Sequence, residues 1–174
     1  LAGSCNVQMH AAPAGQEEAA GKYRISSIQA TASFRYGQWV TEYVRRFGIR
    51  AIIGKAGMDK AIYRDVFAKT GTVFLTTVGY GIAAIYGRCV EGVEAVYWKD
   101  ELGLPEAMWV IRVRNFGPFI VDGDCTGASL ADQAIEVQVC AHHGFGQGDE
   151  ADAAQREPFA GPDHGLVDVV AIDA

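Results

Sequence analysis

The chain has 174 residues, of which 49% are hydrophobic and 21% are charged, so it is long enough to bury one well-packed core. Its formal net charge is −6 and the sequence has no basic stripe, which argues against a nucleic acid or an anionic membrane as its partner. No apolar run approaches the roughly 20 residues that a membrane-spanning helix needs, and the first residues lack the pattern of a secretory leader. We therefore expect a cytoplasmic protein with neither a membrane nor a nucleic-acid partner.

Charge divides the chain into two parts at about Leu130. After Leu130 there are nine acidic residues and one arginine, whereas residues 1–130 hold 12 acidic and 14 basic residues. The later part is also rich in glycine and alanine. We predict one domain, residues 1–130, followed by an acidic extension, residues 131–174, with short edge strands at 134–139 and 166–172.

In the first half of the predicted domain, strands alternate with helices. Strands are expected at 5–10 and 23–28, joined by a polar loop of Gly, Glu and Ala. An amphipathic helix follows, with Gly48 at its end, because apolar side chains recur at helical spacing: Trp39, Val40, Tyr43, Val44 and Phe47. A short buried strand at 49–53, a second helix at 59–69 and a strand at 72–77 continue the pattern.

The second half of the domain is richer in strands. A turn at 78–81 leads into a short helix at 82–86, and we interpret Gly79 and Gly81 as close-packing positions rather than as a dinucleotide motif. Strands are expected at 93–98, 108–113 and 118–121. Strands alternating with helices, then a run of strands, predict a compact α/β domain with a layered, mixed sheet.

Side-chain positions follow from these elements. Arg112 and Arg114 alternate along a strand, so both are expected to face solvent or a partner. The phenylalanines and the three tryptophans are expected in the core: Trp39, Trp98 and Trp109. His10 is interpreted as a hydrogen-bonded structural residue rather than an acid–base group.

Cysteine and histidine are too scattered to predict a metal site. Four cysteines show no CxxC or other close pairing, so their spacing predicts neither zinc nor an iron–sulfur cluster: Cys5, Cys89, Cys125 and Cys140. The His142–His143 pair lies in a Gly- and Asp-rich segment, where a metal role is the weaker hypothesis. We therefore expect no metal bound by this chain.

Two segments carry the residues best suited to chemistry, Thr31–Arg35 and Gly54–Met58. Both are predicted at strand-to-helix junctions, where they present a hydroxyl, a guanidinium and an ammonium group. Arg35 can bind a carboxylate through two parallel hydrogen bonds, and Lys55 supplies a mobile positive charge. This combination indicates a site for a small dianion, although Arg35 and Lys55 could equally form ordinary surface ion pairs.

The same two segments contain smaller residues whose roles are less specific. Gly54 and Gly57 soften the turn that carries Lys55. The hydroxyl of Ser33 either caps a turn or contacts a substrate, and the sequence favours neither alternative.

Four segments in order resemble the β subunit, or C-terminal domain, of the iron–sulfur class I fumarases and L(+)-tartrate dehydratases. They are His10–Pro13, Thr31–Arg35, Ile53–Met58 and the stretch from Glu101 to Pro118. The resemblance implies a swivelling α/β domain that closes over a 4Fe-4S cluster held by a separate α subunit. This chain would then bind no cluster itself and would work in an oligomer with that partner.

The resemblance also implies a reaction and roles for individual residues. The reaction would be dehydration of a small dicarboxylate, either tartrate to oxaloacetate or malate to and from fumarate. By position, Thr31 matches the catalytic base, Arg35 an arginine that binds a substrate carboxylate and Lys55 the substrate-binding lysine. Ser33 and Gly54 are grouped with the substrate-binding residues. An upstream Arg-Asp-x-x-His segment of the family has no match here, so a non-catalytic carboxylate-binding or scaffolding domain is the alternative hypothesis.

Overall fold

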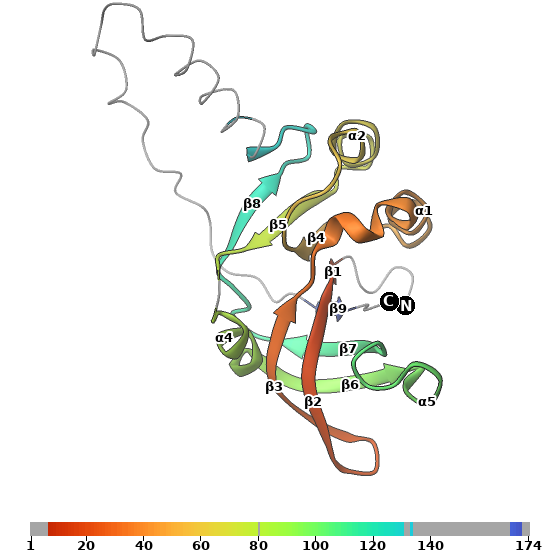
Figure 1. Cartoon of the computed structure of the whole chain (residues 1–174), viewed down its shortest axis with the longest axis vertical. Helices are drawn as coiled ribbons and strands as arrows, with labels where there is room; N and C mark the ends of the chain where they lie inside the picture. Colours follow the sequence, from red (N-terminus) through yellow and green to blue (C-terminus); the bar gives the residue numbers. More distant parts are fainter. Residues whose placement is uncertain (1–6, 80, 131–132, 134–167, 172–174) are drawn as a thin grey trace, which may run out of the picture.

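The main sheet of the structure is seven-stranded and mixed (Figure 1). The structure, a computed structural model, describes residues 7–79, 81–130, 133 and 168–171. Within them the strand order is β6 (Val90–Tyr97), β7 (Met108–Val113), β9 (Asp168–Ala171), β1 (Val7–Met9), β4 (Ala51–Gly54), β5 (Val73–Thr77) and β8 (Phe119–Gly123). Strands β9, β1, β4 and β5 run parallel, and β6, β7 and β8 each pair antiparallel. The predicted α/β class with a mixed sheet is confirmed.

Different elements cover the two faces of this sheet. The hairpin of β2 (Ala11–Ala19) and β3 (Lys22–Ala30) lies on one face, and Figure 1 shows it running past β6 and β7. Helix α4 (Ala83–Arg88) packs on the same side. The opposite face carries η1 (Ser33–Tyr36), α1 (Gly37–Phe47), α2 (Lys60–Ile62), η2 (Tyr63–Phe67) and α3 (Ala68–Thr70). A short helix, α5 (Lys99–Leu102), connects β6 towards β7.

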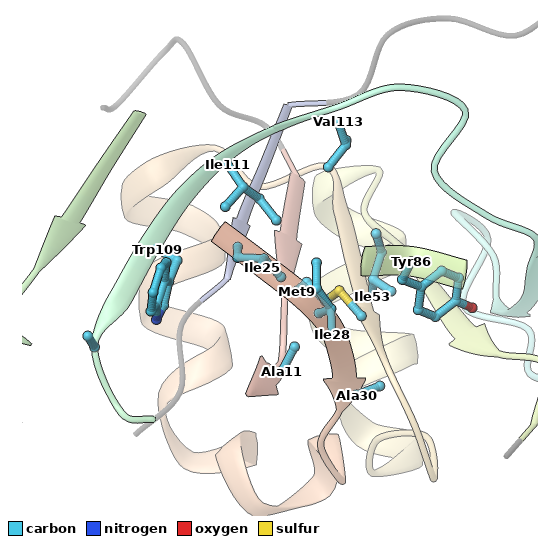
Figure 2. Packing of buried hydrophobic residues seen from close by; sticks show 11 residues of the cluster. Met9, Ala11, Ile25, Ile28, Ala30, Ile53, Tyr86, Trp109, Ile111 and Val113 are labelled. Carbon is cyan, nitrogen blue, oxygen red and sulfur yellow. The ribbon is translucent and has the colours of Figure 1, made fainter. Parts of the chain in front are cut away.

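The core is split by the sheet into two clusters because successive side chains of a strand point to opposite faces. On β4, Ile52 is buried under the helices and Ile53 under the hairpin. Figure 2 shows the hairpin-side cluster: Met9, Ala11, Ile25, Ile28, Ala30, Ile53, Tyr86, Ala107, Trp109, Ile111 and Val113. The helix-side cluster is Tyr36, Val40, Val44, Ile49, Ile52, Met58, Ile62, Tyr63, Val66, Phe67 and Phe74.

The fully buried Trp109 joins the hairpin to the sheet. Its ring meets Tyr23 edge to face, with centroids 5.3 Å apart, and its indole N–H donates to the carbonyl of Leu104 at 3.0 Å. Gly15 of β2 passes so close that a Cβ there would lie 2.7 Å from the Trp109 ring. The position needs glycine because no side chain fits between the strand and the ring.

The predicted elements around the site-bearing segments are confirmed. Helix α1 spans Gly37–Phe47 and ends at Gly48, whose φ of 65° is left-handed, as expected of a glycine at a helix C-terminus. The helical segment at residues 60–70 contains a π turn, η2, and ends at Gly71, which is also left-handed. Strand β7 has the predicted bounds. Arg112 and Arg114 are exposed and pair with Glu94 and Glu91.

The polar loop expected before residue 23 is wrong. Residues Ala11–Ala19 form β2, which pairs antiparallel with β3. The outer half of this hairpin is exposed, so its polar and small residues fit a strand even though they lack apolar alternation. Long-range pairing with β3, rather than local pattern, makes this segment a strand.

The expectation that the large aromatic residues lie in the core is correct only in part. Trp109, Phe67 and Phe74 are fully buried. In contrast, Trp39 and Trp98 are 49% and 54% exposed, and Phe34 and Phe47 are also exposed. Apolar surface is common on folded proteins, so residue type alone did not predict these positions.

Two further expectations fail. Gly79 and Gly81 are not close-packed: apart from their chain neighbours, no described residue has an atom within 4 Å of a Cβ placed there, and their φ values of 144° and 83° explain the glycines instead. Part of the segment at 166–172 does form a strand, but β9 lies between β7 and β1 rather than at an edge. The strand expected at 134–139 and most of the acidic extension lie outside the described residues.

Candidate functional site

The structure brings the two predicted segments together at the ends of neighbouring chain elements. Thr31 follows the last residue of β3, and Lys55 follows the last residue of β4. Ala32 and Lys55 form a parallel β-bridge. The Lys55 N–H donates to the Thr31 carbonyl at 3.3 Å, and the Ser33 N–H donates to the Lys55 carbonyl at 2.9 Å. Residues 20 or more positions apart in sequence are thereby held side by side by the backbone.

Within the described residues, the side chains that could act on a ligand make few contacts with other charged or polar groups. Thr31 and Lys55 are half-buried, and neither side chain has a hydrogen-bond or ion-pair partner within the part of the chain that the structure describes. Arg35 is exposed and contacts Tyr36, donating to its hydroxyl at 3.3 Å and lying 5.5 Å from its ring centroid. Over the same residues neither cation forms an ion pair, which favours the anion site over the surface-pair alternative.

The turn that carries Lys55 contains two residues in the left-handed backbone conformation. Ala56 and Gly57 are both left-handed, with φ of 63° and 68°, and for the alanine this costs about 1 kcal/mol. The Met58 N–H donates to the Tyr63 hydroxyl at 3.0 Å, and that hydroxyl donates to Asp122 Oδ2 at 2.7 Å. The surrounding contacts therefore hold the turn in one conformation, which limits the positions open to Lys55.

Asp59 begins the next helix directly after this turn. Its side chain accepts a hydrogen bond from the N–H of Ala61 at 2.7 Å, which is the usual N-cap interaction. The cap places the start of α2 close behind the Lys55 turn.

Ser33 and Gly54 fit together below the surface. Ser33 is completely buried, and a Cβ on Gly54 would lie 1.8 Å from Ser33 Oγ. Glycine at position 54 therefore leaves the room that the serine hydroxyl occupies. That either residue contacts substrate stays a prediction, because this geometry accounts for both by packing and hydrogen bonding.

The hydroxyl of Ser33 is bonded to His10, which lies between β1 and β2. His10 is 1% exposed; its Nδ1 lies 2.9 Å from Ser33 Oγ and its Nε2 lies 2.7 Å from the Tyr43 hydroxyl. Burial lowers the pKa of His10 from 6.5 to about 4, so the ring is neutral at physiological pH. The prediction of a hydrogen-bonded structural histidine is confirmed.

Sequence reasoning missed the residues that support the site from neighbouring elements. The sequence predicts Tyr43 on the apolar face of α1, and its spacing gives no sign of a polar partner. Tyr63 and Asp122 lie 59 positions apart and meet only in the folded chain. No local pattern could have linked either residue to the Lys55 turn.

The described residues offer no group suited to hold an iron–sulfur cluster or a metal ion. Within residues 7–79, 81–130, 133 and 168–171, no three His, Cys, Asp or Glu side chains gather as a metal site. Cys89 Sγ instead lies 3.3 Å from the carbonyls of Ile85 and Asn115. Cys5, Cys140 and the His142–His143 pair lie outside the described residues. Across that same described part, no helix is long and apolar enough to cross a membrane.

Comparison with known proteins finds relatives that are named as L(+)-tartrate dehydratase beta subunits. A protein of Methanocaldococcus jannaschii named after the L(+)-tartrate dehydratase beta subunit is 41% identical over 107 residues, which are 62% of this chain and 54% of that protein. The L(+)-tartrate dehydratase subunit beta of Escherichia coli is 33% identical over 111 residues, covering 63% of this chain and 53% of the subunit. The chain thus spans about half the length of these relatives.

A fumarase relative matches a larger share of this chain. A protein of Geobacillus stearothermophilus named after class I fumarate hydratase is 35% identical over 121 residues, which are 70% of this chain but 23% of that protein. The sequence model of the family described as Fumarase C-terminus matches residues 6–134, a range that includes both site segments. The chain therefore belongs to the fumarase C-terminus family.

Proposed function

We propose that this chain is the β component of a hydro-lyase that reversibly dehydrates a C4 2-hydroxy dicarboxylate. The Ala32–Lys55 bridge carries this proposal, because it places Thr31 beside Lys55, with Arg35 on the turn that follows. Neither cation forms an ion pair with another described residue, so one hydroxyl and two positive charges are available for proton removal next to a carboxylate. The relatives named as tartrate dehydratase subunits and fumarate hydratase support the same reaction class.

Each residue has a role that follows from the charge that develops. Removal of a proton from the carbon next to a carboxylate pushes negative charge onto that carboxylate. Arg35 and Lys55 stabilise this charge more strongly in the transition state than in the bound substrate. Thr31 takes the proton, and the two cations together with exclusion of water lower the cost of its alkoxide form. The electron pair left by the proton forms the new double bond as the hydroxyl leaves the neighbouring carbon as hydroxide. The proton taken by Thr31 then passes to this hydroxide, so that one water is released and Thr31 returns to its starting form.

The described residues make one side of such a site, so the proposal includes a partner. We propose an α-type subunit that holds a 4Fe-4S cluster and closes over Thr31, Arg35 and Lys55 in an oligomer. When bound to that partner, the cluster would supply Lewis-acid chemistry to the departing hydroxyl. We assign to this chain only substrate binding and proton removal. Tartrate, giving oxaloacetate, and malate, interconverting with fumarate, are the two proposed substrates.

Anaerobic co-expression with an α-type subunit tests the proposal. We expect the complex, and neither chain alone, to release fumarate in an ultraviolet assay or oxaloacetate in a coupled assay. Thr31→Ala should lower kcat by about 10²–10⁴-fold with little change in KM, whereas Thr31→Ser should retain more activity because it keeps the hydroxyl. A complex that binds dicarboxylates without turning them over would support the non-catalytic hypothesis instead.

Variants that remove the charge of Lys55 or Arg35 need controls that remove a positive charge outside the site. Lys55→Ala should lower kcat and raise KM, and Arg35→Ala should mainly weaken binding. Lys69→Ala and Arg45→Ala remove the same charges from exposed helical positions outside the site and should change neither constant. Equal effects at all four positions would show that net charge, rather than the geometry of this site, controls the activity.

A further inference from the structure

A polar cluster of three buried side chains and one half-buried side chain, Tyr43, lies behind the candidate site, on the helix side of the sheet. It consists of Gln8, His10, Ser33 and Tyr43, which come from β1, the residue after β1, η1 and α1. Gln8, His10 and Ser33 are at most 2% exposed. These polar side chains thus lie beside the apolar helix-side cluster, against which Tyr43 packs. Buried polar groups are costly unless they are hydrogen-bonded, so their bonds indicate what the cluster does.

His10 links the cluster through both of its ring nitrogens. Its Nδ1 lies 2.9 Å from Ser33 Oγ, and its Nε2 lies 2.7 Å from the Tyr43 hydroxyl. Burial raises the pKa of Tyr43, Tyr36 adds to the rise, and a side-chain hydrogen bond with Gln8 opposes it. The Gln8 Oε1 atom has no hydrogen-bond partner within the described residues.

Both hydrogen bonds of His10 are compatible with a neutral ring. A neutral imidazole has one N–H that donates and one ring nitrogen that accepts. The Ser33 and Tyr43 hydroxyls can each donate or accept, so either tautomer of His10 forms both bonds. In both cases the His10 ring joins Tyr43 of α1 to Ser33.

His10 also joins the three backbone segments that form the site. Its carbonyl accepts from the Thr31 N–H at 2.7 Å, and its N–H donates to the Ile53 carbonyl at 2.8 Å. Its side chain holds Ser33, whose N–H donates to the Lys55 carbonyl at 2.9 Å. The ring is held in turn by Tyr36, with centroids 4.5 Å apart. One residue thus contacts the segments that carry both Thr31 and Lys55.

We propose that His10 is a positioning residue, whose ring, bonded to Ser33 and Tyr43, fixes Thr31 and Lys55 relative to each other for proton removal. The inference rests on the proposed function. His10 acts through Ser33 and the backbone and does not touch the substrate. Misplacement of reacting groups by about 1 Å can cost up to about 10²-fold in rate, so loss of this support should reduce kcat more than it changes KM.

Tyr43→Phe is the mildest test, because it removes one hydroxyl on the side of His10 away from Ser33. In the co-expressed complex we expect kcat to fall about 10-fold with KM within about twofold. Tyr86→Phe is the matched control: its hydroxyl donates to the Pro118 carbonyl at 2.9 Å in the hairpin-side cluster. Equal kcat in the two variants would overturn the proposal.

A second pair of substitutions separates packing from positioning. Gly54→Ala should lower Tm by about 10 °C, because its Cβ would lie 1.8 Å from Ser33 Oγ. Adding Ser33→Ala removes that oxygen, so the double variant should recover most of the lost Tm. It still lacks the bond to His10, and we expect its kcat to stay about 10-fold below the unsubstituted chain. Recovery of kcat together with Tm would show a packing role only and overturn the proposal.

Amide hydrogen exchange of the full chain gives a readout that needs no activity. The Thr31 amide is bonded to the His10 carbonyl, so Tyr43→Phe should speed its exchange about 10-fold while Tyr86→Phe leaves it unchanged. An unchanged Thr31 amide in Tyr43→Phe would overturn the positioning role even if the complex is active. A faster Thr31 amide in a chain whose complex shows no turnover would support the role of His10 and count against the proposed function.

Discussion

The two faces of the main sheet are packed by different chemistry, although the same strands contribute to both. On the hairpin side, Met9 lies in a cluster dominated by aliphatic residues and Trp109. On the helix side, the neighbours of Met9 in sequence, Gln8 and His10, join the polar cluster with Ser33 and Tyr43. The candidate site lies over the polar cluster. The difference teaches that both faces stabilise the fold by burying apolar side chains, whereas the helix side also uses buried hydrogen bonds to hold particular residues in place.

The largest effect on stability is expected from a substitution in the hairpin-side cluster. Trp109→Ala should lower the free energy of unfolding by about 3–5 kcal/mol, because it leaves a cavity between the hairpin and the sheet. Trp98→Ala, at a position that is 54% exposed, should change it by less than about 1 kcal/mol. Urea unfolding of both variants measures the difference. Similar losses at the two positions would mean that Trp109 does not anchor the hairpin.

The polar cluster should make the free energy of unfolding depend on pH, because it contains His10. The unfolded chain binds a proton at His10 near pH 6.5, whereas the folded chain binds it only near pH 4, because burial lowers the pKa of His10. Stability from this group is complete above pH 6.5 and is lost as the pH falls towards 4, by up to about 3 kcal/mol.

The slope of unfolding free energy against pH, compared between variants, isolates the contribution of His10 to the pH dependence of stability. Unfolding free energies measured from pH 7 to pH 4 should fall less steeply in His10→Asn, which cannot take up the proton. Trp109→Ala should keep the slope of the unsubstituted chain at a lower overall stability. If His10→Asn has that same slope, the proposed distinction between the two faces fails.

Alanine substitutions at two helical glycines, one on each face of the sheet, should change stability by smaller amounts and in opposite directions. A Cβ at Gly87 of α4 would lie 2.3 Å from the Ser26 carbonyl oxygen of β3, so Gly87→Ala should cost about 1–3 kcal/mol. At Gly37, the first residue of α1, a Cβ would lie 3.5 Å from Ile62 Cδ1, an ordinary contact. Gly37→Ala should therefore stabilise the chain by about 0.5–1 kcal/mol through the unfolded state. Thermal unfolding of the pair checks both signs.

The smallest effect is expected at the exposed edge of the sheet. Arg112 pairs with Glu94 across β6 and β7, and the two side chains are 53% and 48% exposed. Glu94→Gln should lower stability by no more than about 0.5 kcal/mol, and added salt should remove most of that difference. A loss above about 1.5 kcal/mol would show that this edge depends on charge as much as the helix side depends on its polar cluster.

Local sequence predicted those elements whose pattern is set by their own residues. The helix at Gly37–Phe47 follows from apolar spacing and from Gly48, and β4 follows from a short apolar run. The hairpin strand β2 and the interior place of β9 could not be predicted this way, because both depend on partners far along the chain. Exposure of Trp39 and Trp98 likewise depends on which element happens to cover each position.

The candidate site likewise has features that the sequence predicts and features that only the fold determines. The sequence by itself determined the chemical groups, Thr31, Arg35 and Lys55, and their place at the ends of strands, because side-chain chemistry and local periodicity are properties of short segments. Only the tertiary structure decided that Lys55 lies beside Thr31, that Gly54 makes room for Ser33, and that His10 and Tyr43 stand behind them. These relations join residues that are distant along the chain, and the folded backbone alone brings their atoms within hydrogen-bonding distance.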